Sequence, residues 1–165
     1  MACLPQMRIG VAGECDGDTL NALTKAILGA AIQIHRTLGP GLLERAYLAC
    51  LTYELAALGL RLEKQKAIPL VYGTMRIGCA YRADILVEGL VVVEVKARDQ
   101  IAPVHRRQLH TYIRLADCRV GLLLNFGAAV MRDGIYRAVN RFPMGSTLRR
   151  TEIRSCSDYR SNSMA

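Results

Sequence analysis

The chain has 165 residues, 52% of them hydrophobic, which is enough for one domain with a single core. Tryptophan is absent and aromatic residues are scarce, so we expect an aliphatic core, and the apolar runs are too short to span a bilayer, so we expect no membrane segment. The net charge of +8 suits a polyanionic partner such as nucleic acid, although basic proteins that never contact nucleic acid are common.

The cysteines are scattered and form no CxxC pair. Cys50, Cys79 and Cys118 lie in apolar segments, where we expect them to be small buried hydrophobes rather than disulfide partners. Residues 1–18 have no basic start followed by an apolar block, so no signal peptide is predicted. Together these features favour a reducing, cytoplasmic setting.

Two helices are predicted in the first third of the chain. After a mobile N-terminal tail (residues 1–18), apolar residues recur at helical spacing over 19–38, and the Gly-Pro-Gly segment 39–41 ends that helix. A second helix is predicted over 42–58, where Gly59 ends it.

The period then changes to that of strands. Strands are predicted over 67–72, 77–86 and 90–97, followed by a helix over 103–116 and a buried strand over 119–126. Pro69 indicates an edge position for the first of these strands.

The last predicted element is a short hairpin that pairs residues 130–131 with 135–136 around an Asp-Gly turn. Residues 142–165 are rich in Ser and Arg and are predicted to be a disordered basic tail. The resulting order ααβββαβ, with this possible terminal hairpin, predicts an α/β domain over 19–141 with a central mixed sheet flanked by helices.

Three charged residues interrupt the apolar strands. Asp84 ends one apolar stretch, and Glu94 and Lys96 lie one residue apart in the next. Burying these charges is costly unless they pair with one another or hold a cation. Two carboxylates and an ammonium are also what metal-dependent phosphodiester cleavage requires, but so short a pattern arises by chance, and an ion pair at a strand edge is the simpler interpretation.

The turn between the two strands decides whether the three residues meet. Glu94 and Lys96 share a face, because side chains alternate along a strand. A two-residue turn would put Asp84 on the other face, whereas a three-residue turn over 87–89 pairs it with Val92, diagonal to Glu94. The chemistry therefore predicts the three-residue turn, which Gly89 permits.

Glu44 is a carboxylate on the apolar face of the second helix. Taken alone, it is a first-turn glutamate favoured by the helix dipole. Together with Asp84 and Glu94, it becomes a candidate third metal ligand.

Further candidates lie on the third helix. Gln108 and Tyr112 are four residues apart and share a helix face, where they can hold a base or phosphate or can simply border the core. His105, Arg106 and Arg107 can contact backbone phosphate, although such a run is more often a solvated face.

These residues together resemble the GxxExxY proteins within the PD-(D/E)XK nuclease superfamily. The matching segments are Gly41-Leu42-Leu43-Glu44-Arg45-Ala46-Tyr47, the preceding 35–40, 78–84, Glu94-Val95-Lys96, 105–112, 121–126 and 133–135. The likeness covers residues 19–141. One departure is Arg106-Arg107, where related sequences often carry an acid.

The resemblance implies a restriction-endonuclease-like fold and a nuclease that uses Mg²⁺ or Mn²⁺ on nucleic acid. It implies that Asp84 and Glu94 bind the metal, that Lys96 is the catalytic lysine and that Glu44 is the helix-borne acid. Gln108 and Tyr112 look like the Gln-x-x-x-Tyr element of RecB-type nucleases.

Two neighbouring carboxylates favour the charged form of an amine, so we expect Lys96 to position water and offset charge rather than to act as a base.

Two other functions stay open. One is a module that binds nucleic acid or a protein without cutting, and the other is an interaction protein whose charges only stabilise a strand edge.

Overall fold

The computed structural model of the protein describes residues 16–141. The predicted tail 142–165 and residues 1–15 of the predicted N-terminal tail lie outside the described residues. The elements in chain order are α1 (Gly17–Leu38), α2 (Glu44–Ala57), β1 (Leu62–Tyr72), β2 (Met75–Val87), β3 (Val91–Lys96), α3 (Pro103–Leu115), β4 (Val120–Asn125), the 3₁₀ helix η1 (Met131–Gly134) and β5 (Ile135–Val139).

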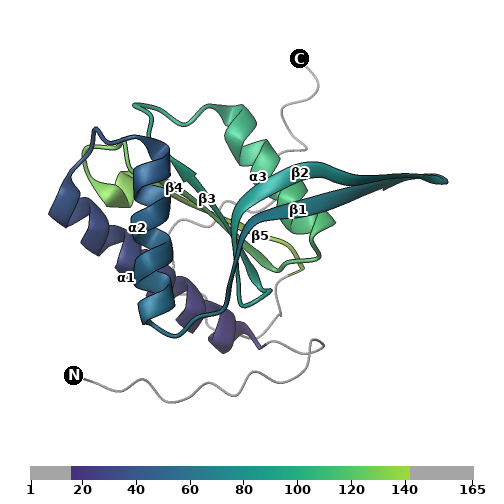
Figure 1. The fold of residues 1–165 in the computed structure, drawn as a ribbon, viewed down its shortest axis with the longest axis horizontal. Helices are drawn as coiled ribbons and strands as arrows, with labels where there is room; N and C mark the ends of the chain where they lie inside the picture. The colour runs from purple at the N-terminus through teal and green to yellow at the C-terminus, as the bar shows by residue number, and fades with distance from the viewer. Residues whose placement is uncertain (1–15, 142–165) are drawn as a thin grey trace.

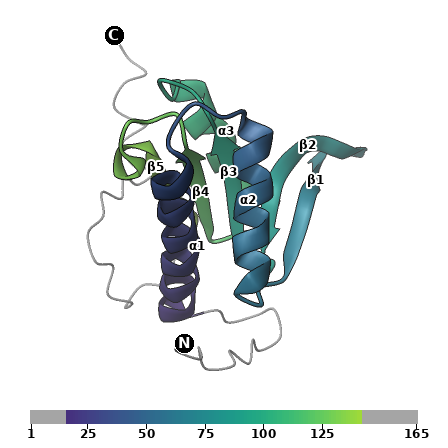
Figure 2. The same cartoon turned by 60° about the vertical axis from the view of Figure 1, so that its left-hand side comes forward.

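The five strands form one sheet in the order β1-β2-β3-β4-β5. Only the β3–β4 pair is parallel, and the chain crosses between these two strands through α3. Helices α1 and α2 cover one face of the sheet and α3 covers the other (Figures 1 and 2). The predicted α/β fold with a mixed sheet flanked by helices is confirmed.

The central strands are apolar on both faces because helices cover both. Val91, Val93 and Val95 of β3 pack in the core under α1 and α2, whereas Val92 packs in the second core under α3. Gly121 of β4 lets α3 approach closely, since a Cβ there would lie 2.7–2.9 Å from side-chain atoms of Ile113 and Leu109. The backbone of the sheet is thereby held between two cores.

The predicted terminal hairpin is wrong. Residues 131–134 form η1, and β5 then pairs antiparallel with β4, from Leu124↔Ile135 to Val120↔Val139. A five-residue pairing with the open edge of a buried strand satisfies more backbone groups than an isolated two-residue hairpin could. Gly134 allows the close approach, because a Cβ at this position would clash with the carbonyl oxygen of Asn125.

Two predicted boundaries also move. Helix α1 begins at Gly17, because the side chain of Asp16 accepts the backbone N–H of Thr19 at 2.7 Å and caps the helix, so the predicted tail was too long. Strand β1 begins at Leu62 rather than at residue 67. The edge position that Pro69 indicated is confirmed, and the β1–β2 register shifts beside this proline.

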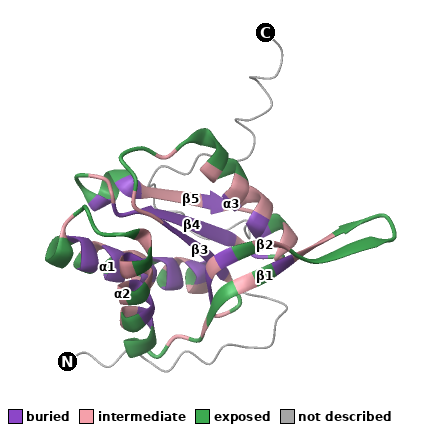
Figure 3. Ribbon diagram, turned by 45° about the horizontal axis from the view of Figure 1, so that its top comes forward, coloured by how far each residue is buried: buried purple, intermediate pink, exposed green. Residues whose placement is uncertain are grey.

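Strands β1 and β2 continue beyond the sheet as a two-stranded ribbon that projects from the body of the molecule (Figures 1 and 3). Residues 71–79 at its end are all exposed. The prediction that Cys79 is buried is therefore wrong, whereas Cys118 is buried and Cys50 is partly buried. None of the helices within residues 16–141 is long and apolar enough to cross a membrane.

Candidate active site

The turn between β2 and β3 sets the faces of the charged residues. It has three residues, as predicted, but they are 88–90 rather than 87–89, and the pairs are Val87↔Val91, Leu86↔Val92 and Ile85↔Val93. The partner of each β2 residue on β3 therefore shifts by two residues from the predicted one, and because the shift is even, the same side chains still share a face. Continued by one residue, it brings Asp84 opposite Glu94 rather than opposite Val92, on the same face.

Glu88 makes this turn possible. Glu88 and Gly89 both have a positive φ, of 54° and 70°. The backbone N–H of Glu88 donates to the carbonyl of Arg61 at 2.9 Å, and the N–H of Arg61 donates to Oε1 of Glu88 at 2.5 Å. These two hydrogen bonds with Arg61, which lies just before β1, hold Glu88 in the left-handed region although it is not a glycine. They thereby fix the length of the turn.

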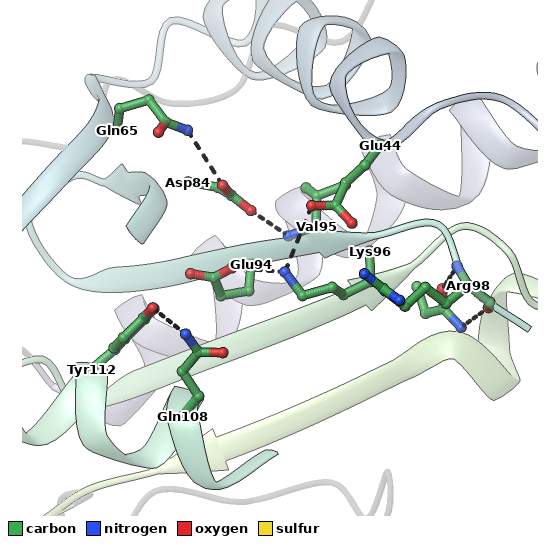
Figure 4. Close-up of polar contacts among 10 residues, drawn as sticks. Glu44, Gln65, Asp84, Glu94, Val95, Lys96, Arg98, Gln108 and Tyr112 are labelled. Atoms are coloured by element: carbon green, nitrogen blue, oxygen red, sulfur yellow. Dashed lines mark hydrogen bonds and ion pairs between the residues drawn. The ribbon is translucent and has the colours of Figure 1, made fainter. Parts of the chain in front are cut away.

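Asp84 lies where β2 and β3 separate. Its Oδ2 accepts the backbone N–H of Val95 at 2.9 Å, and its Oδ1 accepts the side-chain amide of Gln65 at 3.3 Å. A carboxylate thus takes the place of a ladder hydrogen bond at the point where regular pairing stops. Figure 4 shows the side chain between the two strands, directed toward Val95 and its neighbour Glu94.

Glu94 is the most deeply buried acid of the group, with only 6% of the residue exposed. Its Oε2 lies 3.3 Å from Nζ of Lys96, whereas its buried Oε1 receives no hydrogen bond from the described residues. Burial and then the negative charge of Asp84 raise the pKa of Glu94 to about 8, and Lys96 offsets part of this rise. Two carboxyl groups therefore meet where one oxygen lacks a donor, so a proton or a cation is needed between them.

Glu44 reaches the group from α2. It is the first residue of that helix, and its Oε1 lies 3.7 Å from Nζ of Lys96. Lys96 thus lies between Glu44 and Glu94, as Figure 4 shows. In residues 16–141 no group of three or more His, Cys, Asp or Glu side chains is arranged to hold one metal ion. The structure makes Glu44 a partner of Lys96, and its role as a third metal ligand stays a prediction.

Tyr47, to which the sequence analysis assigned no role, helps to position Glu44. The hydroxyl of Tyr47 donates to the carbonyl of Gly39 at 2.6 Å and accepts the N–H of Leu42 at 3.1 Å. Its ring stacks on Phe126, with centroids 4.5 Å apart. Tyr47 therefore ties the loop before α2 to the core next to β4. Its spacing of three residues from Glu44, which puts both on the same helix side, was the available signal.

Asn125 is a second residue that sequence reasoning missed. It ends the apolar run of β4, is only 2% exposed, and donates its side-chain amide to the carbonyl of Arg98 at 2.7 Å. Its Oδ1 accepts the backbone N–H of Arg98 at 2.9 Å. Asn125 therefore fixes the chain as it leaves Lys96. A lone amide after four apolar residues was the signal.

Of the five predicted nucleic-acid-binding residues, Gln108 and Tyr112 lie on the side of the acidic group where Glu94 is, as Figure 4 shows. The amide of Gln108 donates to the hydroxyl of Tyr112 at 2.5 Å, and burial and then the charge of Glu94 raise the pKa of Tyr112. His105 has a buried Nδ1 without a partner among the described residues. Burial and then the positive charges of Lys96 and Arg98 lower the pKa of His105.

The remaining two predicted residues, both arginines, lie elsewhere on α3. The guanidinium carbon of Arg106 lies 5.0 Å from the ring centroid of Tyr136 on β5. Arg106 also lines a cavity of about 410 Å³ together with Asp99 and Asn125, and Glu44, Asp84 and Glu94 are not among the residues that line it. Arg107 is exposed. The structure therefore does not bring these arginines together with Lys96.

Asp84 and Glu94 fit a hard divalent cation. Such ions take carboxylate oxygens as ligands, and the oxygen of Glu94 that lacks a donor lies beside a second carboxylate. A bound cation would favour the ionised form of Glu94, which burial and Asp84 otherwise oppose.

Comparison with known proteins identifies the family. The searches of curated proteins and of solved structures each found no match. A sequence profile described as the PD-(D/E)XK nuclease superfamily matches residues 21–138, which is most of the chain and includes Glu44, Asp84, Glu94 and Lys96. The chain therefore belongs to the PD-(D/E)XK nuclease superfamily.

Proposed function

We propose that this protein is a metal-dependent nuclease that hydrolyses phosphodiester bonds of nucleic acid with Mg²⁺ or Mn²⁺ held by Asp84 and Glu94. The observation that carries the proposal is the buried Oε1 of Glu94, which receives no hydrogen bond from the described residues while Asp84 lies beside it. Membership of a nuclease superfamily supports the same conclusion. A cation bound there lowers the pKa of a coordinated water and offsets charge that builds on the phosphate.

Lys96 supplies the positive charge of the site. Its ammonium is held 3.3 Å from Glu94 and 3.7 Å from Glu44, so it is fixed at the end of β3 rather than free to sample solvent. From this position it can orient the attacking water and donate to a phosphate oxygen. An amine held as the ion-pair partner of two carboxylates suits an electrostatic role better than proton abstraction.

Residues of α3 are the ones that we expect to contact the substrate. The Gln108–Tyr112 pair lies beside Glu94, and the His105 ring has a buried Nδ1 without a partner among the described residues. We assign these three to contacts with the nucleic-acid backbone or a base next to the scissile phosphate. We assign Arg106 and Arg107 to contacts with the polymer farther from the reaction centre.

Within the superfamily, we assign the chain to the GxxExxY proteins. The contacts of the named residues support this assignment, because Tyr47 holds the loop that precedes α2 and Glu44 pairs with the lysine of the site.

A cleavage assay tests the proposal. Purified wild type and Lys96→Ala are incubated with double-stranded DNA, single-stranded DNA and RNA, with Mg²⁺, with Mn²⁺ or with a chelator. We expect metal-dependent cleavage by the wild type and a loss of about a hundredfold or more in Lys96→Ala, since an electrostatic group at the reacting centre is removed. Lys25→Ala, an exposed lysine of α1, is the matched control and should cleave like the wild type.

Equal rates for the wild type and Lys96→Ala, at any level, would show that catalysis is wrongly assigned. If neither cleaves but both bind nucleic acid in a salt-sensitive way, the fold serves as a binding module instead.

A further inference from the structure

The projecting ribbon begins beside the active site. We call residues 69–80, which join the regular parts of β1 and β2, the arm. At its base Ile68 is 1% exposed, and the ring of Tyr81 lies 5.4 Å from that of Tyr112. Asp84 follows three residues after Tyr81 on the same strand. A polymer that lies along the arm toward its base would therefore approach the group formed by Asp84, Glu94 and Lys96.

One face of the arm is apolar and exposed. The register pairs Leu70 with Ile77 and Tyr72 with Met75, so these four side chains share a face. Tyr72 is 77% exposed, Met75 52% and Ile77 39%. Four adjacent apolar side chains on a projecting tip are the kind of patch that marks an interaction site.

The arm and its base are strongly basic. Residues 61–82 contain a single acidic residue, Glu63, which pairs with Lys66, and the basic residues Arg61, Lys64, Lys66, Arg76 and Arg82. Arg76 lies on the other face of the tip, opposite Val71. Apolar contact surface flanked by unbalanced positive charge complements a polyanion with exposed base edges better than it complements a second copy of this basic chain.

The shape of the arm favours double-stranded DNA over double-stranded RNA. It is a bare two-stranded ribbon closed by a turn at Gly73 and Thr74, and residues 71–79 are all exposed. The major groove of B-form DNA admits a two-stranded ribbon, whereas the major groove of A-form RNA is too deep and narrow for side chains to read. Met and Ile side chains are also among those that wedge between base steps.

We propose that the arm grips double-stranded DNA beside the active site, with the apolar face of its tip in a groove and with Arg76 and the basic side chains at its base on the phosphates. The proposal rests on the proposed function only in taking the polymer to be a nucleic acid, and it names duplex DNA as the substrate class.

Binding in the absence of divalent metal tests this separately from cleavage. The probe is a fluorescently labelled DNA duplex with a chelator present, and anisotropy is measured for the full chain at several salt concentrations. Tyr72→Ser/Ile77→Ser should weaken duplex binding about tenfold, since apolar groove contacts are removed. Arg76→Gln should weaken binding and lower the slope of log K against log salt by about one. Tyr53→Ser, which removes a 73% exposed tyrosine from α2, should bind like the wild type.

Single-stranded DNA and double-stranded RNA are measured with the same proteins. The proposal holds if the duplex DNA is bound best and only the arm variants lose that preference. It is overturned if the arm variants bind the duplex like the wild type, if no nucleic acid is bound, or if sedimentation shows that the wild type self-associates and the arm variants do not. The last result would assign the arm to a second copy. Cleavage failing while arm-dependent binding persists would remove the proposed function alone.

Discussion

At the scale of single residues, Glu94 is the least compatible with its surroundings. A carboxyl group that is 6% exposed, next to a second carboxylate and with one oxygen lacking a donor, is unfavourable in its ionised form. Lys96 offsets only part of this cost, because it is shared with Glu44. Such a conflict between a residue and its environment is typical of functional sites, where stability is given up for binding or catalysis.

Glu94 makes the stability of the metal-free protein depend on pH. Burial and the charge of Asp84 raise the pKa of Glu94 to about 8 in the folded protein, from an ordinary value of 4.5. The folded state therefore holds more protons between these values, so the free energy of unfolding falls as pH rises from about 4.5 to about 8 and then levels off. With a chelator present, we expect the Tm of the wild type to fall by several degrees relative to that of Glu94→Gln over this window.

Circular dichroism melts of the two proteins at matched pH values measure this difference. Gln is nearly isosteric and does not titrate, so it serves as the reference. Parallel Tm curves for the two proteins would contradict the environment assigned to Glu94.

At the scale of elements, the loop before α2 and the start of that helix act as one unit. Tyr47 closes the loop on itself through Gly39 and Leu42, and Phe126 anchors the tyrosine ring. Glu44 lies one turn earlier on the same helix, so the position of its carboxylate depends on this loop. The stacked ring of Tyr47 and its two hydrogen bonds thus position the carboxylate of Glu44 near Lys96 at the end of β3.

Tyr47→Phe tests this connection. The variant keeps the stacked ring and loses both hydrogen bonds, so we expect the free energy of unfolding to fall by about 1 kcal/mol. Cleavage should also weaken, because Glu44 is less well placed to hold Lys96. Urea denaturation and the cleavage assay measure the two effects. Tyr53→Phe, on the exposed side of α2, should change neither. A Tyr47→Phe protein as stable as the wild type would show that these bonds contribute nothing.

Sequence reasoning succeeded where a local pattern decided the outcome. The alternation along β3 placed Glu94 and Lys96 on one face, and the need for Asp84 to join them gave the correct parity of the turn. The turn's position was missed because Glu88 takes a positive φ only with the help of Arg61, 27 residues away. The pairing of β5 with β4 and the support from Asn125 likewise depend on contacts between distant segments.

At the scale of the whole molecule, the site lies where the sheet divides. Strand β2 runs out of the arm paired with β1, and it pairs with β3 only over its last residues, Ile85 to Val87. Strand β3 pairs along its whole length with β4 in the body. The division leaves Asp84 and Glu94 facing each other without a regular ladder between them. Two cores pack on either side of the sheet, and the exposed arm extends away from it (Figure 3).

Calorimetric titration of Mn²⁺ into the metal-free protein tests the central claim most directly. We expect the wild type to bind Mn²⁺ and, near pH 7, to release a proton from Glu94, which appears as a heat that changes with the ionisation enthalpy of the buffer. Asp84→Asn and Glu94→Gln should each weaken binding at least about tenfold, and Glu94→Gln should release no proton. Binding of equal affinity by the wild type and both variants, or no binding by the wild type, would contradict a metal centre formed by these two carboxylates.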